Sequence, residues 1–180
     1  ENVVQLVGIS RDITETKLYE KHLLETAYRD DLTGLPNRKA LHDHLTQSAH
    51  KSQPFVLLLL NIDRFKNIND TLGHSDGDNL LRLAANRLRE KLAENVFIAR
   101  TGGDEFAVVC VADQRHAVID AALQCFTEAF PLADESTFVT ASLGVAMYPG
   151  DSDNVDEIFK CASAALWRAK AAGRNNCQWF

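Results

Sequence analysis

The pattern of hydrophobic and polar residues predicts helices that alternate with strands. Apolar and β-branched runs predict strands at 55–63, 96–100, 106–111 and 138–147, with 176–180 as a further edge strand. Apolar residues at helical spacing predict helices at 38–49, 78–92, 116–130 and 155–172. Two of the strands flank a short glycine turn, which indicates a hairpin. The pattern as a whole indicates an α/β fold, a central sheet with helices on its faces.

The first thirty residues have a different pattern. Residues 3–9 predict a short strand, and a charged amphipathic helix is expected from Thr14 onward. The narrow apolar seam of this helix suits pairing with a second copy of the chain. Packing on its own domain is the alternative, because so few turns do not define a heptad.

Composition and charge restrict the class of protein. Of 180 residues, 46% are hydrophobic and 24% charged, as in a globular domain with a core. The net charge of −6 argues against a general nucleic-acid binder, so a nucleotide site needs local cations or metal ions. No apolar run is long enough to span a membrane. Four widely spaced cysteines lack a zinc or disulfide pattern, which predicts reduced thiols in a cytoplasmic protein.

The end of the buried strand at 55–63 is one candidate site. Its apolar run stops at Asn61, Ile62 and Asp63, which places oxygen atoms at a strand end beside a loop. Such strand ends are favoured places for metal and ligand sites in α/β sheets. A turn-stabilising role is the alternative for these side chains.

The hairpin turn at 102–106 is a second candidate. Gly102 and Gly103 allow close approach of a phosphate, and Asp104 and Glu105 place two carboxylates at the tip. Carboxylates repel a phosphate unless a hard cation lies between them. A site with only a few protein ligands suits Mg²⁺, which completes its coordination shell with water and substrate phosphates. Such a pair can also deprotonate a hydroxyl group. The alternative is a solvated turn.

Three cations form a third candidate. Lys66 follows the buried strand, and Lys170 and Arg174 lie four residues apart at the end of the last helix, which predicts one helical face. Together with the carboxylates they offer a clamp for a triphosphate. The alternative is that the last two complement the helix dipole.

Five separated motifs resemble the GGDEF family of diguanylate cyclases. They are, in order along the chain, DDLTGLPNR, IDRFKNINDTLGHSDGD, RTGGDEF, TASLGVA and AKAAGRN. The resemblance covers residues 30–180 and implies a GGDEF fold, a mostly antiparallel sheet flanked by helices, similar to the palm of class III nucleotide cyclases. Residues 1–13 resemble the end of a PAS domain, which leaves 14–29 as a signalling helix.

The resemblance implies that two domains face each other as a homodimer, each with one GTP, and form cyclic di-GMP with Mg²⁺ or Mn²⁺. Asp104 then binds metal and helps to activate the hydroxyl, the carbonyl of Ile62 is a second ligand, and Glu105 supports the site. The implied nucleotide contacts are Asn69 and Asp78 with guanine, His74 in the same pocket, Lys66, Lys170 and Arg174 with phosphates, and Gly102 and Gly103 in the turn.

The chain departs from the family pattern at two places. Asn61 stands where the family usually has a metal-binding Asp, and the loss of charge predicts weaker metal binding, with Asp63 as a possible substitute. Residues 93–96 lack the Arg and Asp of the product-binding RxxD motif, which predicts no product inhibition there. A catalytically impaired GTP-binding module that controls an adjacent domain is therefore the alternative function. The last residues resemble the junction before an EAL phosphodiesterase domain, one candidate for that neighbour.

Overall fold

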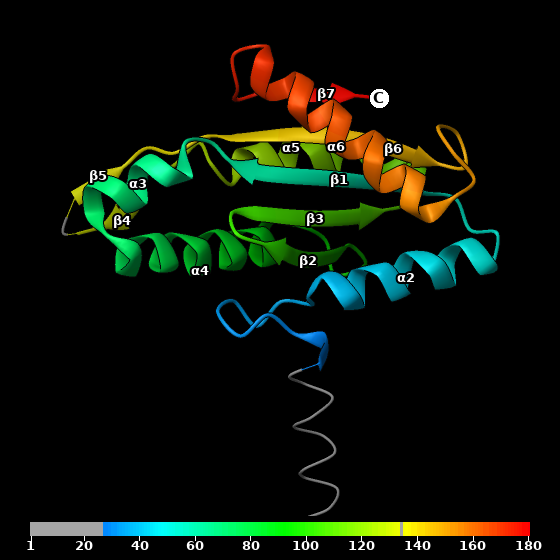
Figure 1. Ribbon diagram of the computed structural model, residues 1–180, viewed down its shortest axis with the longest axis horizontal. Helices are drawn as coiled ribbons and strands as arrows, with labels where there is room; N and C mark the ends of the chain where they lie inside the picture. Colours follow the sequence, from blue (N-terminus) through cyan, green and yellow to red (C-terminus); the bar gives the residue numbers. More distant parts are fainter. Residues whose placement is uncertain (1–26, 134) are drawn as a thin grey trace, which may run out of the picture.

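A five-stranded sheet organises residues 27–133 and 135–180, the part of the chain that the computed structural model describes (Figure 1). The strand order is β2-β3-β1-β6-β7, and all neighbours are antiparallel except β6 and β7. The central strand is buried along its whole length, as its apolar run predicts. The strands are β1 (Phe55–Ile62), β2 (Phe97–Gly102), β3 (Glu105–Cys110), β6 (Ala141–Tyr148) and β7 (Cys177–Trp179).

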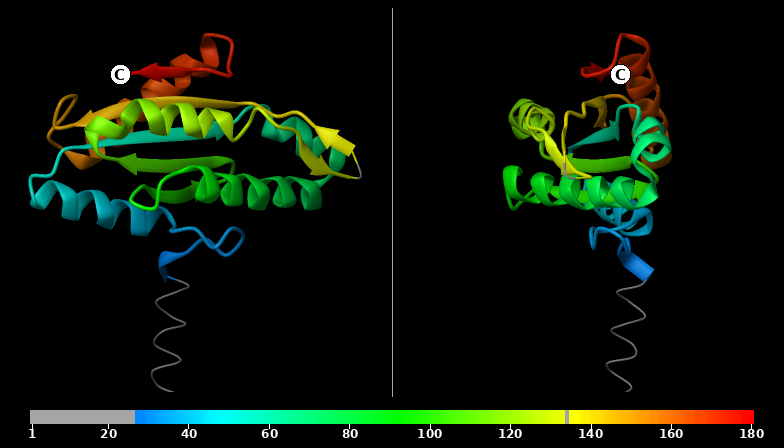
Figure 2. Two further views of the ribbon diagram at one scale, coloured as in Figure 1. Left: turned by 180° about the vertical axis from the view of Figure 1, so that it is seen from behind. Right: turned by 90° about the vertical axis from the view of Figure 1, so that its left-hand side faces the viewer.

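Helices cover both faces of this sheet (Figure 2). On one face α4 (His74–Lys91) and α5 (Arg115–Gln124) pack on the side chains of Leu58 and Leu60. On the other face α2 (Arg38–His50) and α6 (Val155–Ala171) pack on those of Leu57 and Leu59. Because successive side chains of a strand point to opposite faces, the unbroken apolar run of β1 serves both cores.

Close packing of α6 on β6 depends on Gly144. A Cβ atom at this position would overlap the backbone of Ala162 and Leu166. The absence of a side chain therefore lets α6 lie directly on the strand. The turn that follows α6 then reaches the end of β1, where the N–H of Asn175 donates to Asp63.

One helix was not predicted. The segment after β1 forms α3 (Phe65–Leu72), and Gly73, with φ 90°, separates it from α4. Phe65, Ile68 and Leu72 pack against the core at helical spacing, a signal that the nearby turn residues concealed. Gly77, interpreted as a turn residue, is buried inside α4, which consequently begins four residues earlier than predicted.

The remaining differences concern element ends. Helix α5 ends at Gln124, because the chain turns there into a small hairpin of β4 (Phe130–Leu132) and β5 (Glu135–Thr137). A 3₁₀ turn, Ala112–Gln114, precedes α5. Strand β6 begins at Ala141 rather than at residue 138. The strand predicted at 3–9 and the PAS-like segment 1–13 lie outside the described residues, as does the signalling helix 14–29 apart from its last three residues.

The cysteines agree with the sequence pattern. Cys110, Cys125 and Cys161 are buried and all four cysteines are free, as predicted. Burial raises the pKa of Cys110, Cys125 and Cys177 to about 11, which keeps these thiols protonated at neutral pH. Among the described residues, no helix combines the length and hydropathy that crossing a bilayer requires.

Candidate functional site

The hairpin tip lies beside the end of the central strand. Asn61 is in register with Glu105, and the backbone N–H of Ile62 donates to the carbonyl oxygen of Asp104 at 3.2 Å. The side-chain amide of Asn61 lies 3.5 Å from the same oxygen. Two segments that the sequence separates by some forty residues therefore form one site, and antiparallel pairing of β1 with β3 is what joins them.

The turn between β2 and β3 requires its glycines. Gly102 has φ 137° and Gly103 has φ 54°, and a Cβ atom at either position would meet no neighbour, so backbone conformation rather than space selects glycine. Asp104 and Glu105 are half-buried at the tip. The hydroxyl of Thr101 donates to Oε1 of Glu105 at 2.6 Å, which orients that carboxylate. No hydrogen bond of the described residues engages the carboxylate of Asp104.

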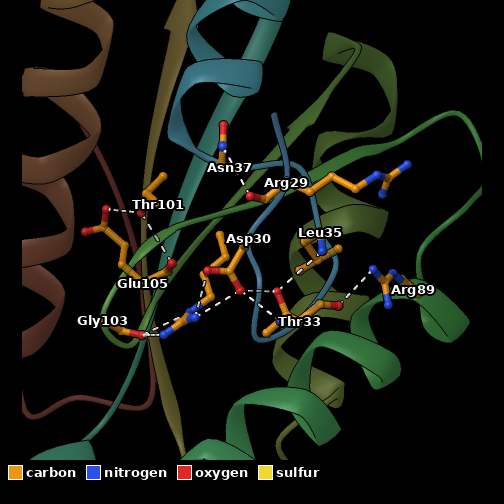
Figure 3. Close-up of polar contacts among 10 residues, drawn as sticks. Arg29, Asp30, Thr33, Leu35, Asn37, Arg89, Thr101, Gly103 and Glu105 are labelled. Atoms are coloured by element: carbon orange, nitrogen blue, oxygen red, sulfur yellow. Dashed lines mark hydrogen bonds and ion pairs between the residues drawn. The ribbon is translucent and has the colours of Figure 1, made fainter. Parts of the chain in front are cut away.

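An ion pair fastens the turn to the start of the domain (Figure 3). Nη1 of Arg100 lies 2.9 Å from both carboxylate oxygens of Asp30. Nε and Nη2 of the same guanidinium donate to the carbonyl oxygen of Gly103 at 3.1 and 2.6 Å. One side chain thus links the first motif of the domain to the glycine hairpin. Sequence reasoning missed this pair, although both residues lie within recognised motifs.

Further hydrogen bonds stabilise the charged form of Asp30. The backbone N–H and the hydroxyl of Thr33 both donate to Oδ1, at 2.9 and 2.6 Å. Burial acts to raise the pKa of Asp30, but the hydrogen bonds from Thr33 and Arg100 outweigh it, so the pKa lies below the usual 3.8. Nη2 of Arg89 in α4 also donates to the carbonyl of Thr33 at 3.1 Å, which ties this loop to the helix (Figure 3).

Asp63 is committed to hydrogen bonds within the fold. Its Oδ1 accepts from the hydroxyl of Ser142 at 2.6 Å. Its Oδ2 accepts from the hydroxyl of Thr140 at 2.7 Å and from the backbone N–H of Asn175 at 3.0 Å. The side chain is only 6% exposed. This arrangement ties β1 to β6 and to the turn after α6, so we do not retain the expectation that Asp63 replaces the charge missing at Asn61.

Asn69 and Gly77 form a matched pair between α3 and α4. Oδ1 of Asn69 is buried without a hydrogen-bond partner among the described residues. A Cβ atom at Gly77 would overlap this oxygen, so the glycine makes room for the amide. His74 and Asp78 lie exposed in the first turns of α4, and Asp78 directly follows Gly77. The expected guanine residues therefore come from adjacent parts of two helices.

The expected phosphate-binding cations lie in α3, in α6 and in the turn after α6. Lys66 is exposed in the first turn of α3. Lys170 lies in the last turn of α6, whereas Arg174 lies beyond the helix with φ 67°. The prediction that Lys170 and Arg174 share one helical face is wrong, because α6 ends at Ala171 and Gly173 turns the chain.

The oxygen donors near the hairpin tip suit a hard divalent cation, although Asn61 is a neutral amide and the total negative charge of the donors is therefore smaller than with a carboxylate there. Asp104, Ile62 and Asn61 lie together where the hairpin tip pairs with the end of β1, and Mg²⁺ prefers the carboxylate, carbonyl and amide oxygens that these residues carry and retains several waters. In residues 27–133 and 135–180 no three His, Cys, Asp or Glu side chains cluster as a complete metal cage. A cation here therefore needs water and substrate oxygens to fill its coordination shell.

Comparison with known proteins identifies the family. The family model described as "Diguanylate cyclase, GGDEF domain" matches residues 27–176. The chain belongs to the GGDEF family. The GGDEF match ends four residues before the last residue of the sequence and includes every predicted site residue.

Curated relatives of this GGDEF domain differ in function. The chain is 38% identical over 165 residues to the cyclic di-GMP phosphodiesterase NbdA of Pseudomonas aeruginosa, covering 88% of this chain and 21% of that protein. It is 35% identical over 177 residues to the diguanylate cyclase DgcM of Escherichia coli, covering 94% of this chain and 42% of that protein. The chain thus spans less than half the length of these relatives.

Solved structures confirm the fold. The diguanylate cyclase SiaD of Pseudomonas aeruginosa, solved with its activator SiaC, superposes with a TM-score of 0.81 at 32% identity, over 92% of this chain and 66% of that one. The coiled coil and GGDEF domain of DgcB from Caulobacter crescentus, in complex with c-di-GMP, also gives 0.81, at 28% identity and 93% coverage of both chains. The mostly antiparallel sheet flanked by helices is therefore the GGDEF fold.

Proposed function

We propose that this domain is a diguanylate cyclase that condenses two GTP molecules into cyclic di-GMP. The observation that carries the proposal is the pairing of the hairpin tip with the end of β1, in which the backbone carbonyl of Asp104 contacts the N–H of Ile62 and the side-chain amide of Asn61. Family membership and cyclase relatives such as DgcM support the same reaction.

Guanine is the base that the two helices fit best. The Watson–Crick edge of guanine carries N–H donors beside a carbonyl acceptor. The carboxylate of Asp78 can accept from those donors, and the amide of Asn69 offers both an NH₂ donor group and a carbonyl acceptor. The unpartnered oxygen of Asn69 gains a partner if a base donates to it, which removes the cost of a buried, unpaired polar atom. His74, exposed in the first turn of α4, would lie beside the bound base.

Asp104, the carbonyl of Ile62 and the amide oxygen of Asn61 would hold Mg²⁺ or Mn²⁺, with Glu105 in support. A bound cation supplies positive charge against the phosphates and acidifies a hydroxyl group. Asp104 then accepts the proton of the 3′-hydroxyl at a carboxylate oxygen. Lys66, Lys170 and Arg174 neutralise the triphosphate, and the glycine turn lets it approach the backbone.

A dimer is part of this proposal. Each domain binds one GTP, and each 3′-hydroxyl attacks the α-phosphate held by the partner copy, so two pyrophosphates leave as two phosphodiester bonds form. The helix at 14–29, mostly outside the described residues, is the proposed dimerisation segment. We expect a cytoplasmic location, because GTP is the substrate.

Product feedback at the usual surface is not part of the proposal. Residues 93–96, between α4 and β2, carry neither the guanidinium nor the carboxylate of an RxxD motif. Calorimetric titration with cyclic di-GMP is expected to show no tight binding to the domain. Micromolar or tighter binding that a Glu94→Ala, Asn95→Ala double variant abolishes would contradict this.

Asn61 favours a second function, that of a GTP-binding regulatory module without catalysis. A neutral amide stands at the usual metal-binding carboxylate, while the residues proposed for guanine and phosphates are all present. Catalysis needs the complete metal site, whereas binding needs only part of it. In this version GTP would regulate a neighbouring domain, and an EAL phosphodiesterase is one candidate.

The deciding experiment is incubation of the purified chain with GTP and Mg²⁺ or Mn²⁺, followed by chromatographic detection of cyclic di-GMP. Metal-dependent product that disappears in Asp104→Ala supports the cyclase. Metal-dependent GTP binding without product supports the regulatory module. If GTP does not bind at millimolar concentration with either metal, both proposals fail. Asp113→Ala, an exposed acid far from the hairpin tip in the sheet, is the matched control.

A further inference from the structure

A cavity of about 540 Å³ lies behind α3 and is separate from the proposed metal and guanine positions. Its walls are one side of α3, the segment 137–140 before β6, and the turn 173–175 after α6. Asn61, Asp104, Asn69 and Asp78 do not line it. Its volume is within the range of pockets that hold small molecules.

One end of the cavity is positively charged. Arg64 and Arg174 both line it, and neither guanidinium has a hydrogen bond or ion pair within residues 27–133 and 135–180. Both residues have left-handed backbones, with φ 55° and 67°. Asp63 is the acidic residue of the lining, and its carboxylate already accepts three hydrogen bonds. The unpaired charge that remains favours an anion, which a planar guanidinium can bind through two parallel hydrogen bonds.

The other end of the cavity is apolar. Ile68 and Leu72 of α3 line it together with Val139 and Phe138. Phe138 is 77% exposed, the highest value among the large hydrophobic side chains of the described residues. An aromatic ring left so open beside an apolar wall can stack on a flat ligand and gain free energy from the area that both bury.

We propose that this cavity binds a small amphipathic anion, a flat aromatic body that carries one carboxylate or phosphate group. The body would lie between Phe138 and α3, and the anionic group would reach Arg64 and Arg174. Binding itself needs neither GTP nor metal. One consequence rests on the proposed function: because Arg174 is also a proposed phosphate contact, the ligand would compete with the triphosphate for that guanidinium.

The test uses the fluorescent aromatic anion anilinonaphthalene sulfonate as a probe of the 180-residue chain without nucleotide. We expect one saturable site. Phe138→Ala and Arg64→Asn should each weaken binding of the probe about tenfold, through lost stacking and a lost charge-assisted hydrogen bond respectively. Asparagine is chosen because it tolerates a left-handed backbone. Phe138 is so exposed that its truncation leaves the fold intact, which circular dichroism checks.

Two matched controls make the result decisive. Val111→Ala removes another exposed apolar side chain, and Arg82→Ala removes an exposed guanidinium of α4. Both should leave probe affinity unchanged. Competition by phenyl phosphate but not phenylacetate identifies a phosphate group, and the reverse identifies a carboxylate. The proposal is overturned if Phe138→Ala and Arg64→Asn bind the probe as the unmodified chain does, or if the controls lose as much affinity. Neither result bears on GTP binding, which is measured separately.

Discussion

Two residues at the end of β1, Asn61 and Asp63, occupy similar positions with opposite consequences. They lie on the same face of the strand, and both are less than 10% exposed, at 8% and 6%. Asp63, on the side of β6, accepts three hydrogen bonds. Asn61, on the side of the hairpin, makes one long contact of 3.5 Å with the backbone of Asp104.

The difference shows how neighbours decide what a polar group at a strand end does. A buried carboxylate with its oxygens already engaged stabilises the fold and has little capacity left for a ligand. The polar atoms beside the hairpin tip are incompletely engaged, so a cation and a substrate can use them. A polar side chain that stabilises the fold and one that we propose as a metal ligand are thus two residues apart, and substitutions should separate the two roles.

The largest effect is expected on the free energy of unfolding when Asp63 is replaced. Asp63→Ala removes the acceptor for the hydroxyl of Ser142, which is fully buried, and for the N–H of Asn175. Loss of one partner from such a buried charged network should lower the free energy of unfolding by about 4 kcal/mol. Urea unfolding followed by circular dichroism measures this.

Asp153→Ala, an exposed acid before α6, is the control and should change stability by less than about 0.5 kcal/mol. If Asp63→Ala is as stable as this control, the assignment of Asp63 to the fold is wrong. If it does not fold at all, Asp63→Asn, which retains acceptor capacity on one atom, should still unfold at lower urea than the unmodified chain.

The second largest effect is expected on GTP binding when Asp104 is replaced. Asp104→Ala should lower the affinity for GTP in the presence of Mn²⁺ about 100-fold, equivalent to about 2.8 kcal/mol, because the charged oxygen ligand is lost. Stability should hardly change, since no hydrogen bond of the described residues depends on this carboxylate. Calorimetry gives the affinity and urea unfolding the stability. If Asp104→Ala is destabilised as much as Asp63→Ala, Asp104 also stabilises the fold, and the proposed division between a structural Asp63 and a ligand-binding hairpin tip is wrong.

The third effect concerns the ion pair that holds the hairpin from outside. Asp30→Asn should lower the free energy of unfolding by about 2 kcal/mol at pH 7, because Arg100 and Thr33 lose a charged acceptor. The pKa of Asp30 is lowered in the folded state, so its contribution is complete above the ordinary value of 3.8 and is lost as the pH falls through the folded value.

Unfolding by urea at several pH values checks this. The difference between the unmodified chain and Asp30→Asn should shrink as the pH falls below 3.8. Asp31→Asn, the exposed neighbouring carboxylate, should show neither the difference nor its pH dependence. A difference that grows on acidification would mean that the carboxylate of Asp30 does not stabilise the fold in its charged form.

The order of the strands and helices could be predicted from the sequence, because β1 and the long helices have strong apolar periodicity. The hairpin could also be predicted, since its glycines have the backbone that a tight turn needs. The helix α3 could not, because Gly73 and Gly77 indicate turns locally and only contact with Asn69 explains the second glycine.

The residues of the candidate site could be predicted as types, but their partners could not. Periodicity and spacing alone do not show that Asp63 belongs to the fold, since its partners Thr140, Ser142 and Asn175 lie about eighty or more residues away. The bond from Arg100 to Asp30 likewise spans seventy residues. Motif resemblance supplied a list of residues, and the sheet register determined which of them meet.

The smallest effect is expected from restoring the charge at the functional position. Asn61→Asp adds a carboxylate close to the backbone of Asp104, so that a metal held at the proposed site would gain a second charged ligand. Ligands that carry charge bind more strongly than neutral ones, and we expect about a tenfold gain in Mn²⁺-dependent GTP affinity, equivalent to about 1.4 kcal/mol, with a rise in cyclic di-GMP formation. Without metal the two carboxylates repel each other, so the melting temperature should fall slightly and recover when Mn²⁺ is added.

The control is Asn95→Asp, which adds the same charge far from the hairpin tip at an exposed amide between α4 and β2. It should change neither the Mn²⁺-dependent GTP affinity nor the melting temperature. If Asn61→Asp binds metal and nucleotide no better than Asn95→Asp, the hairpin side of β1 is not a metal site that lacks a charge. Asn61 would then have no functional role to set against the structural role of Asp63.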